Sequence, residues 1–305
     1  MSEPRSDLTV AVARRRAGAR DRGFRLGLVA PGIVVLLLVG IFPLVYLLMV
    51  SFQNITMSDT DTSFQGLLNY KLLFADSRLW EALGHTLVFI AIALPVELVL
   101  GLLMAQLFIE RIPGRAVFVA LLVLPVLVSP IVAGATWSLM FDNRFGPINQ
   151  ILGWIVGQPV NLLWTIKPNL VYPAILVAEI WQWTPFMFLL LLAALSAVDK
   201  SQLEAAAIDG ASWWRSFRLI VLPAIWPVMA VAILIRALDL FRLFDIVWAL
   251  TKGGPGTMTE TISMFAYVKG FQQFETSYVA AVALLIIVLL SVAVLWALKR
   301  VELAR

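Results

Sequence analysis

Long apolar blocks are the feature of this sequence that most constrains its fold. A helix that crosses a bilayer needs roughly 20 mostly apolar residues, and blocks of at least that length recur along the 305-residue chain. They cover residues 27–52, 83–109, 115–141, 170–196, 221–250 and 276–298. Because lipid offers no partner for an unpaired backbone amide or carbonyl, such blocks cross as helices. The sequence therefore predicts an all-α polytopic membrane protein with six transmembrane helices.

The composition excludes a water-soluble globular protein. Hydrophobic residues make up 61% of the chain and charged residues 14%. A typical soluble domain contains about 45–50% apolar residues and about 25% charged residues. The chain has no cysteine and only one histidine, His85. These counts exclude disulfides, thiolate metal sites and a histidine-rich metal site, so we expect no metal to be bound.

The basic residues predict how the chain is oriented in the membrane. The N-terminal segment, the C-terminal segment and the links at 110–115 and 197–220 together hold more than twice as many Lys and Arg as the other three loops. The positive-inside rule then places both termini in the cytoplasm. The expected parts are a cytoplasmic tail at 1–25, a membrane domain at 26–300 and a short tail at 301–305. The stretch from Arg14 to Arg25 either touches anionic lipid head groups or forms a solvated, disordered tail.

The cytoplasmic link at 198–223 is unlike the short link at 110–115. Ser201 and Glu204 have the spacing of a capping box, and an alanine run follows them. Gly210 is placed to end that helix in a left-handed turn. A second short helix would carry Trp213, Trp214 and Phe217 on one side. The sequence thus predicts a helix–turn–helix at the cytoplasmic surface.

This link resembles the EAA loop of ABC import permeases. The matching residues are Glu204-Ala205-Ala206, Gly210, Ile220 and Leu222-Pro223. In that family the loop docks into a groove on the ATPase subunit. The resemblance therefore implies an ATPase-coupling set of Glu204, Ala205, Ala206, Asp209, Gly210 and Ala211. The alternative is that Glu204 only caps a helix and Gly210 only ends it, and both roles are compatible with docking.

Three further stretches narrow the resemblance to the maltose-type sugar permeases, first subunit of the pair. These are residues 125–149, 179–195 and 244–256, and the resemblance covers about residues 26–300. It implies a bacterial inner-membrane importer of a sugar or sugar-like solute. The implied partners are a second permease subunit, an ATPase subunit dimer, a periplasmic or extracellular solute-binding protein and membrane lipid, with no nucleic acid. The chain has no Gly-x-x-x-x-Gly-Lys-Ser/Thr loop, so we expect it to be no enzyme and to bind no cofactor. ATP and Mg would be held by the partner ATPase.

Four charges of alternating sign lie in the fifth apolar block. Arg236, Asp239, Arg242 and Asp245 recur at every third position. A charge at a helix centre costs about 2.5–3.5 kcal/mol on an insertion scale, so these side chains must face protein or water. We hypothesise that a solute path is lined by Gln182, Trp183, Thr184, Asp239, Arg242 and Asp245. The alternative is that the charges only lock helices together.

Two other carboxylates lie inside apolar blocks. Glu97 and Glu179 are each surrounded in the sequence by apolar residues. For both, a structural hydrogen bond is the expected role.

Two other functions fit parts of the sequence. An ion-coupled secondary transporter would explain the charges and the prolines within the blocks, but such proteins usually contain repeated halves, and none is visible here. It also leaves the 204–223 pattern unexplained. An intramembrane enzyme is disfavoured because no catalytic set accompanies the lone histidine.

Overall fold

The computed structural model describes residues 27–56, 62–110 and 112–303. These residues form helices and connecting loops without a strand, which confirms the all-α class. The predicted N-terminal tail lies outside the described residues. After the helical segment that starts at Gly27, the elements are η1 (Leu37–Ile41), α2 (Phe42–Ser51), α3 (Leu68–Ala75), α4 (Ser77–Leu107), α5 (Arg115–Leu127), α6 (Pro130–Met140), α7 (Pro147–Val156), α8 (Pro168–Ser196), α9 (Lys200–Ile208), α10 (Trp213–Ser216), η2 (Phe217–Val221), α11 (Leu222–Phe241), α12 (Asp245–Leu250), α13 (Ile262–Tyr267), η3 (Val268–Gln272) and α14 (Thr276–Leu303), where η marks a π-helical turn.

Five continuous helical segments are long and apolar enough to cross a membrane. They are Gly27–Ser51, Ser77–Leu107, Pro168–Ser196, Trp213–Phe241 and Thr276–Lys299. The bent pair α5 and α6 makes a sixth if the two helices form one span. The predicted polytopic architecture is therefore confirmed, with one span broken.

Helix α8 is the centre of the bundle. In its most apolar stretch 61% of the residues are buried, against 6% in the first span. Helix α4 crosses α8 closely because Gly101 has no side chain: a Cβ there would lie 2.6 Å from the Cβ of Met187. Helices α5 and α11 also pack on α8, while α14 packs on α2 and α3. A core of buried apolar side chains thus joins helices that are far apart in the sequence.

The third apolar block differs from the single span expected at 115–141. Helices α5 and α6 meet at 96° across a break at residues 128–129. Val128 and Ser129 have extended ψ angles of 133° and 136°, as the ring of Pro130 favours for the residue before it. The carbonyl of Val128, left without a helical partner, accepts a hydrogen bond of 2.7 Å from Nε2 of Gln182.

The fifth apolar block also differs from the expected span at 221–250. The helix begins earlier, at Trp213, and ends at Phe241, after which α12 starts at Asp245. Asp239 lies in the last turn of α11, Arg242 is the C-cap residue and Asp245 belongs to α12. The four alternating charges therefore do not lie on one continuous helix.

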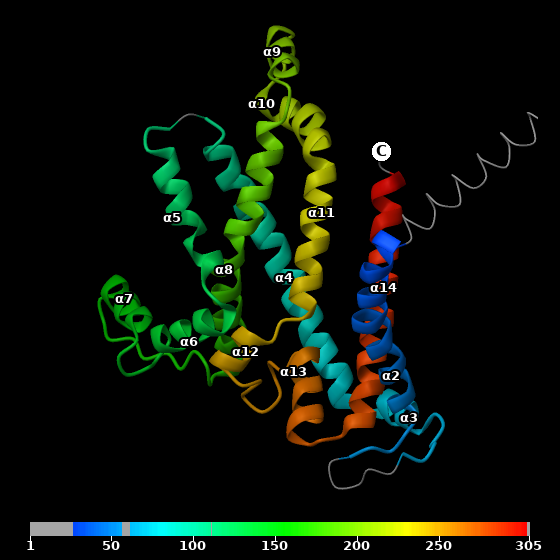
Figure 1. Cartoon of the computed structure of the whole chain (residues 1–305). Coiled ribbons are helices and arrows are strands. Elements are labelled where there is room, and N and C mark those ends of the chain that lie inside the picture. The colour runs from blue at the N-terminus through cyan, green and yellow to red at the C-terminus, as the bar shows by residue number, and fades with distance from the viewer. Residues whose placement is uncertain (1–26, 57–61, 111, 304–305) are drawn as a thin grey trace, which may run out of the picture.

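The two ends of the described chain lie at the same end of the molecule. Figure 1 shows the C-terminal end of α14 and the start of the first helix at the end that also carries α9 and α10, with α7, α12 and α13 toward the other end. Helix α14 extends to Leu303, so the first three residues of the expected tail at 301–305 are helical, beyond the candidate span that ends at Lys299.

Candidate functional site

The α9–α10 loop starts at a capped helix end. The carboxylate of Asp199 accepts the backbone N–H of Ser201 at 2.9 Å. The predicted capping box at Ser201 and Glu204 is wrong. The N-cap residue is Asp199, because α9 begins at Lys200 and Ser201 lies within the helix. The hydrogen bonds from Ser201 lower the pKa of Asp199 below its ordinary value, so the cap is ionised at neutral pH.

Gly210 ends α9 as expected. Its φ angle is +73°, in the left-handed region that only glycine adopts without strain. The N–H of Ala211 bonds the carbonyl of Ala206 at 2.9 Å, and the N–H of Gly210 bonds that of Ala207 at 3.1 Å. These two bonds are those of a Schellman motif, which satisfies the last carbonyls of the helix. The turn fixes the direction in which the chain leaves α9.

Among the described residues, none buries the surface of α9. Glu204, Ala205, Asp209 and Gly210 are exposed, while Ala206 and Ala211 are half-buried. Ile208 is 87% exposed. Helix α9, which carries this side chain, protrudes from one end of the bundle (Figure 1).

The second short helix has the expected aromatic side. The ring of Trp213 stacks on that of Phe217 at 5.4 Å and 8°, and the ring of Trp214 lies 5.8 Å from it. Both indoles remain largely exposed. The stack stiffens the short helix that leads through η2 into α11.

Inside the membrane region, Arg236 joins three helices. Its guanidinium donates to both carboxylate oxygens of Glu97, at 2.7 and 2.9 Å, and also to Glu179. Its Cζ lies 4.6 Å from the ring centroid of Trp183. Arg236 is 1% exposed. The expected structural hydrogen bonds of Glu97 and Glu179 are confirmed, and this cluster of Glu97, Glu179 and Arg236 is called the charge triad below.

The predicted solute-path residues fall into two groups. Gln182 and Thr184 are buried, and Trp183 is half-buried against Arg236. Asp239 and Arg242 form an ion pair of 2.6 Å in which the Arg242 side chain is 71% exposed, and Asp245 is exposed. The structure thus brings Asp239 to Arg242 and Trp183 to Arg236, and it buries Gln182 and Thr184. Their role in a path stays a prediction.

The profile of a known family covers the whole region just described. The family is described as "binding-protein-dependent transport system inner membrane component", and it matches residues 72–303. The chain belongs to this family. The match spans the α9–α10 loop and all three helices of the charge triad.

Named relatives of the permease include sugar transporters. The chain is 37% identical over 240 residues to the trehalose/maltose transport system permease protein MalF of Thermococcus litoralis, and the match covers 79% of this chain and 81% of the relative. It is 33% identical over 281 residues to the trehalose transport system permease protein SugA of Mycobacterium tuberculosis (strain ATCC 25618 / H37Rv), covering 91% and 89%. A solved bacterial ABC transporter involved in the import of the acidic polysaccharide alginate contains a chain with the same fold, with a TM-score of 0.82 and 22% identity over 95% of this chain and 98% of that one.

Sequence reasoning missed the partner of Arg236 in the permease. Glu97 and Arg236 are 139 positions apart, so no local spacing links the two residues. The available signal was that an arginine and two isolated carboxylates all lay in apolar blocks, where unpaired charges are costly.

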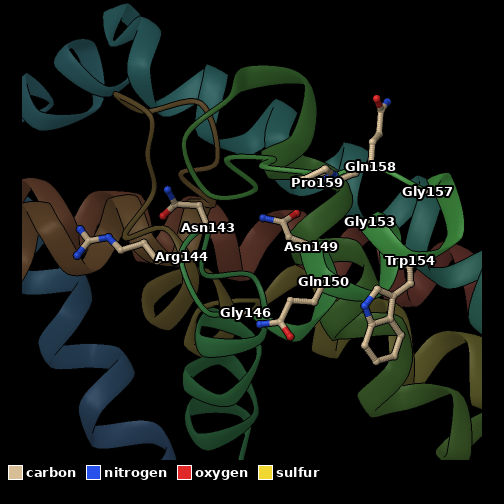
Figure 2. Close-up of a pocket in the computed structure, with 11 residues that line it drawn as sticks. Asn143, Arg144, Gly146, Asn149, Gln150, Gly153, Trp154, Gly157, Gln158 and Pro159 are labelled. Carbon is tan, nitrogen blue, oxygen red and sulfur yellow. The ribbon is translucent and has the colours of Figure 1, made fainter.

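A hollow with a mixed apolar and polar lining, called the polar hollow below for the amide and guanidinium groups in it, lies toward the end of the permease remote from the α9–α10 loop. It has a volume of about 630 Å³, and Figure 2 shows it beside α7. Its lining includes Asn143, Arg144, Asn149, Gln150, Trp154 and Gln158. Among the described residues, no group of three or more His, Cys, Asp or Glu side chains is placed to hold a metal ion.

Proposed function

We propose that the chain is one of two permease subunits of a bacterial ABC importer and forms half of the translocation path for a sugar or sugar-like solute. The observation that carries this proposal is the exposed α9–α10 loop within a chain of this family. The named solutes of two relatives, trehalose and maltose, support a sugar. The energy would come from ATP hydrolysis on a separate ATPase subunit.

The α9–α10 loop is proposed as the contact with the ATPase. Glu204, Asp209 and Gly210 are exposed on it, and Ile208 supplies an apolar anchor. Exposed apolar side chains that fit a partner's pocket commonly dominate the energy of such contacts. ATP and Mg would be bound by the ATPase dimer, and this chain would bind no cofactor.

The charge triad supports a way for loop motion to reach the membrane. The loop is continuous with α8 at one end and with α11 at the other. Glu179 on α8 and Arg236 on α11 are joined deep in the bundle, and Glu97 adds α4. A displacement of the loop would therefore move α4, α8 and α11 as a unit instead of spreading α8 from α11.

The remaining partners follow from the same assignment. A second permease subunit would complete the path, and an external solute-binding protein would deliver the solute at the end that carries α7 and α12. Both termini would lie in the cytoplasm, at the end of the coupling loop. Gln182, Trp183, Thr184, Asp239, Arg242 and Asp245 remain the proposed path residues.

The test is transport by the reconstituted complex. The permease pair and ATPase are placed in liposomes with the binding protein and radiolabelled trehalose or maltose, and uptake and ATP hydrolysis are measured together. We expect uptake only with ATP, and hydrolysis stimulated by loaded binding protein. Uptake by this chain alone, driven by an ion gradient, would overturn the proposal.

A further inference from the structure

Helix α7 turns Asn149 inward and carries an apolar stripe on its outward side. Asn149 is 5% exposed; its side chain donates to the carbonyl of Leu162 at 3.0 Å and accepts from Nε1 of Trp164 at 2.9 Å. On the outward side, Ile151, Trp154 and Ile155 are 49%, 85% and 75% exposed. Their i, i+3, i+4 spacing forms one apolar stripe. A stripe of this kind is normally covered.

The position of α7 in the molecule favours lipid as the partner of this apolar stripe. Helix α7 carries no charged residue, and it lies on the same side of the bundle as α5 (Figure 1). Helix α5 exposes large apolar side chains such as Val117 and Leu121, as expected for the first part of a membrane span. The stripe of α7 thus lies beside a helix whose exposed apolar side chains the bilayer would cover. The stripe itself offers no hydrogen-bonding group outside the indole N–H of Trp154, as suits contact with acyl chains.

The polar hollow adjoins the stripe. Figure 2 shows Gln150 and Trp154 on α7, with Arg144 and Gln158 on the segments either side of it. The carboxylate of Asp142 accepts the N–H groups of Arg144 and Phe145. The Arg144 side chain is exposed and makes no ion pair within the described part of the chain. A guanidinium and several amides suit a phosphate ester, and Trp154 lies where the hollow meets the stripe.

We propose that α7 lies in the bilayer interface, with the stripe of Ile151, Trp154 and Ile155 against acyl chains and the hollow holding a phospholipid head group. Tryptophan at the boundary between polar and apolar surroundings is typical of interfacial helices. The proposal rests on the proposed function only in naming the leaflet, which is the outer one.

The first test measures depth. Because the chain has no cysteine, Ile155→Cys and Gln158→Cys each give a single site for a nitroxide label in bilayers that contain the assembled complex with cysteine-free partners. We expect the label at 155 to be more accessible to oxygen than to a water-soluble nickel chelate, and the label at 158 to show the reverse. Access of the nickel chelate to 155, or shielding of 155 from both reagents by protein, would overturn the interfacial placement.

The second test concerns the head group. A fluorophore at Gln158→Cys is titrated with dihexanoyl phosphatidylglycerol, with inorganic phosphate and with trehalose, in the detergent-solubilised complex. We expect a saturable response to the phospholipid that Arg144→Gln weakens roughly tenfold or more, as for loss of a hydrogen bond to a charged group. Lys71→Gln, an exposed cation on α3 at the far side of the bundle (Figure 1), is the control and should leave it unchanged.

Each contrary outcome has one meaning. An absent response to the phospholipid, or a response to trehalose alone, would overturn the head-group site. An equal response to inorganic phosphate would overturn the lipid as its source. Neither test needs ATP or transport, so a failure here is separate from a failure of the proposed importer function.

Discussion

The guanidinium of Arg236 can be buried in the membrane region because two carboxylates and an aromatic ring surround it. Glu97 binds it through both oxygens, Glu179 adds a further acceptor and Trp183 offers its ring face. Breaking such a pair by removing one partner leaves an uncompensated buried charge, which is far costlier than the net gain from forming it. At the end of the same helix, Arg242 and Asp239 form a pair that solvent reaches.

Arg236→Gln should therefore destabilise the protein strongly. We expect a loss of about 3–5 kcal/mol, because two carboxylates would remain buried without a cation. Arg242→Gln is the matched control and should cost at most about 1 kcal/mol, as for exposed ion pairs. The measurement is thermal unfolding of the purified complex in detergent. Equal melting temperatures for the two variants would contradict the role of the charge triad.

The exposed pair can be tested for a role in transport. If Asp239 and Arg242 line the solute path, Asp239→Ala and Arg242→Ala should reduce solute uptake while basal ATP hydrolysis and assembly persist. The reason is that exposed side chains contribute little to folding but can contact the solute. Uptake and hydrolysis are measured separately in proteoliposomes. Wild-type uptake by either variant removes that residue from the proposed path.

Among the elements, the α9–α10 loop combines internal order with an uncovered surface. The Asp199 cap, the Schellman turn at Gly210 and the aromatic stack on α10 hold its shape. Within the described chain no residue of α9 or α10 is buried. Local hydrogen bonds therefore preform the loop, and a partner subunit would bind it without first having to order it.

Gly210→Val should uncouple hydrolysis from transport. No atom lies within 4 Å of a Cβ at this position, so the substitution has room, but valine strongly disfavours a φ of +73°. The turn would change direction, and α9 would no longer present Glu204 to the ATPase. Gly210→Asn, which tolerates the left-handed region, is the control.

The readouts are recovery of the complex by co-purification and uptake per ATP hydrolysed. We expect Gly210→Val to reduce both, and Gly210→Asn to retain most of each. Normal accumulation by the valine variant would show that the turn geometry is not needed for coupling.

On the scale of the whole molecule, the α9–α10 loop and the C-terminal end of α14 lie toward one end, and the polar hollow lies toward the other (Figure 1). The basic links identified in the sequence belong to the first end: Arg115 begins α5, and Arg215 lies in α10. The positive-inside rule predicts that this end lies in the cytoplasm.

Single cysteines can test this orientation in a chain that has none. Ile208→Cys, on the α9–α10 loop, should be unreactive toward a membrane-impermeant maleimide in intact cells and reactive in inside-out vesicles from which the ATPase has been stripped. Gln158→Cys should react in the opposite way. Both positions are exposed, so reactivity reports sidedness instead of burial. Labelling of position 208 in intact cells would reverse the proposed topology.

The sequence by itself determined the features that depend on neighbouring residues. Transfer of an apolar block into lipid is a property of the block, so the number and approximate place of the spans were predictable. The turn at Gly210 and the aromatic side of α10 depend on residues within one or two helical turns, and both were predicted. The capping box failed because Asp199, two positions earlier, competes for the same helix start.

Only the tertiary structure decided how distant helices meet. Arg236 lies beside Glu97, 139 positions away, because α4 and α11 cross near α8, and no rule of local spacing gives that contact. The broken third span depends on Gln182 of α8 satisfying the carbonyl of Val128, and the outward apolar stripe of α7 depends on Asn149 being drawn inward by Leu162 and Trp164. In each of these three cases a buried polar group is satisfied by a partner that only helix packing brings within hydrogen-bond distance. The order of residues along the chain does not show which partner that is.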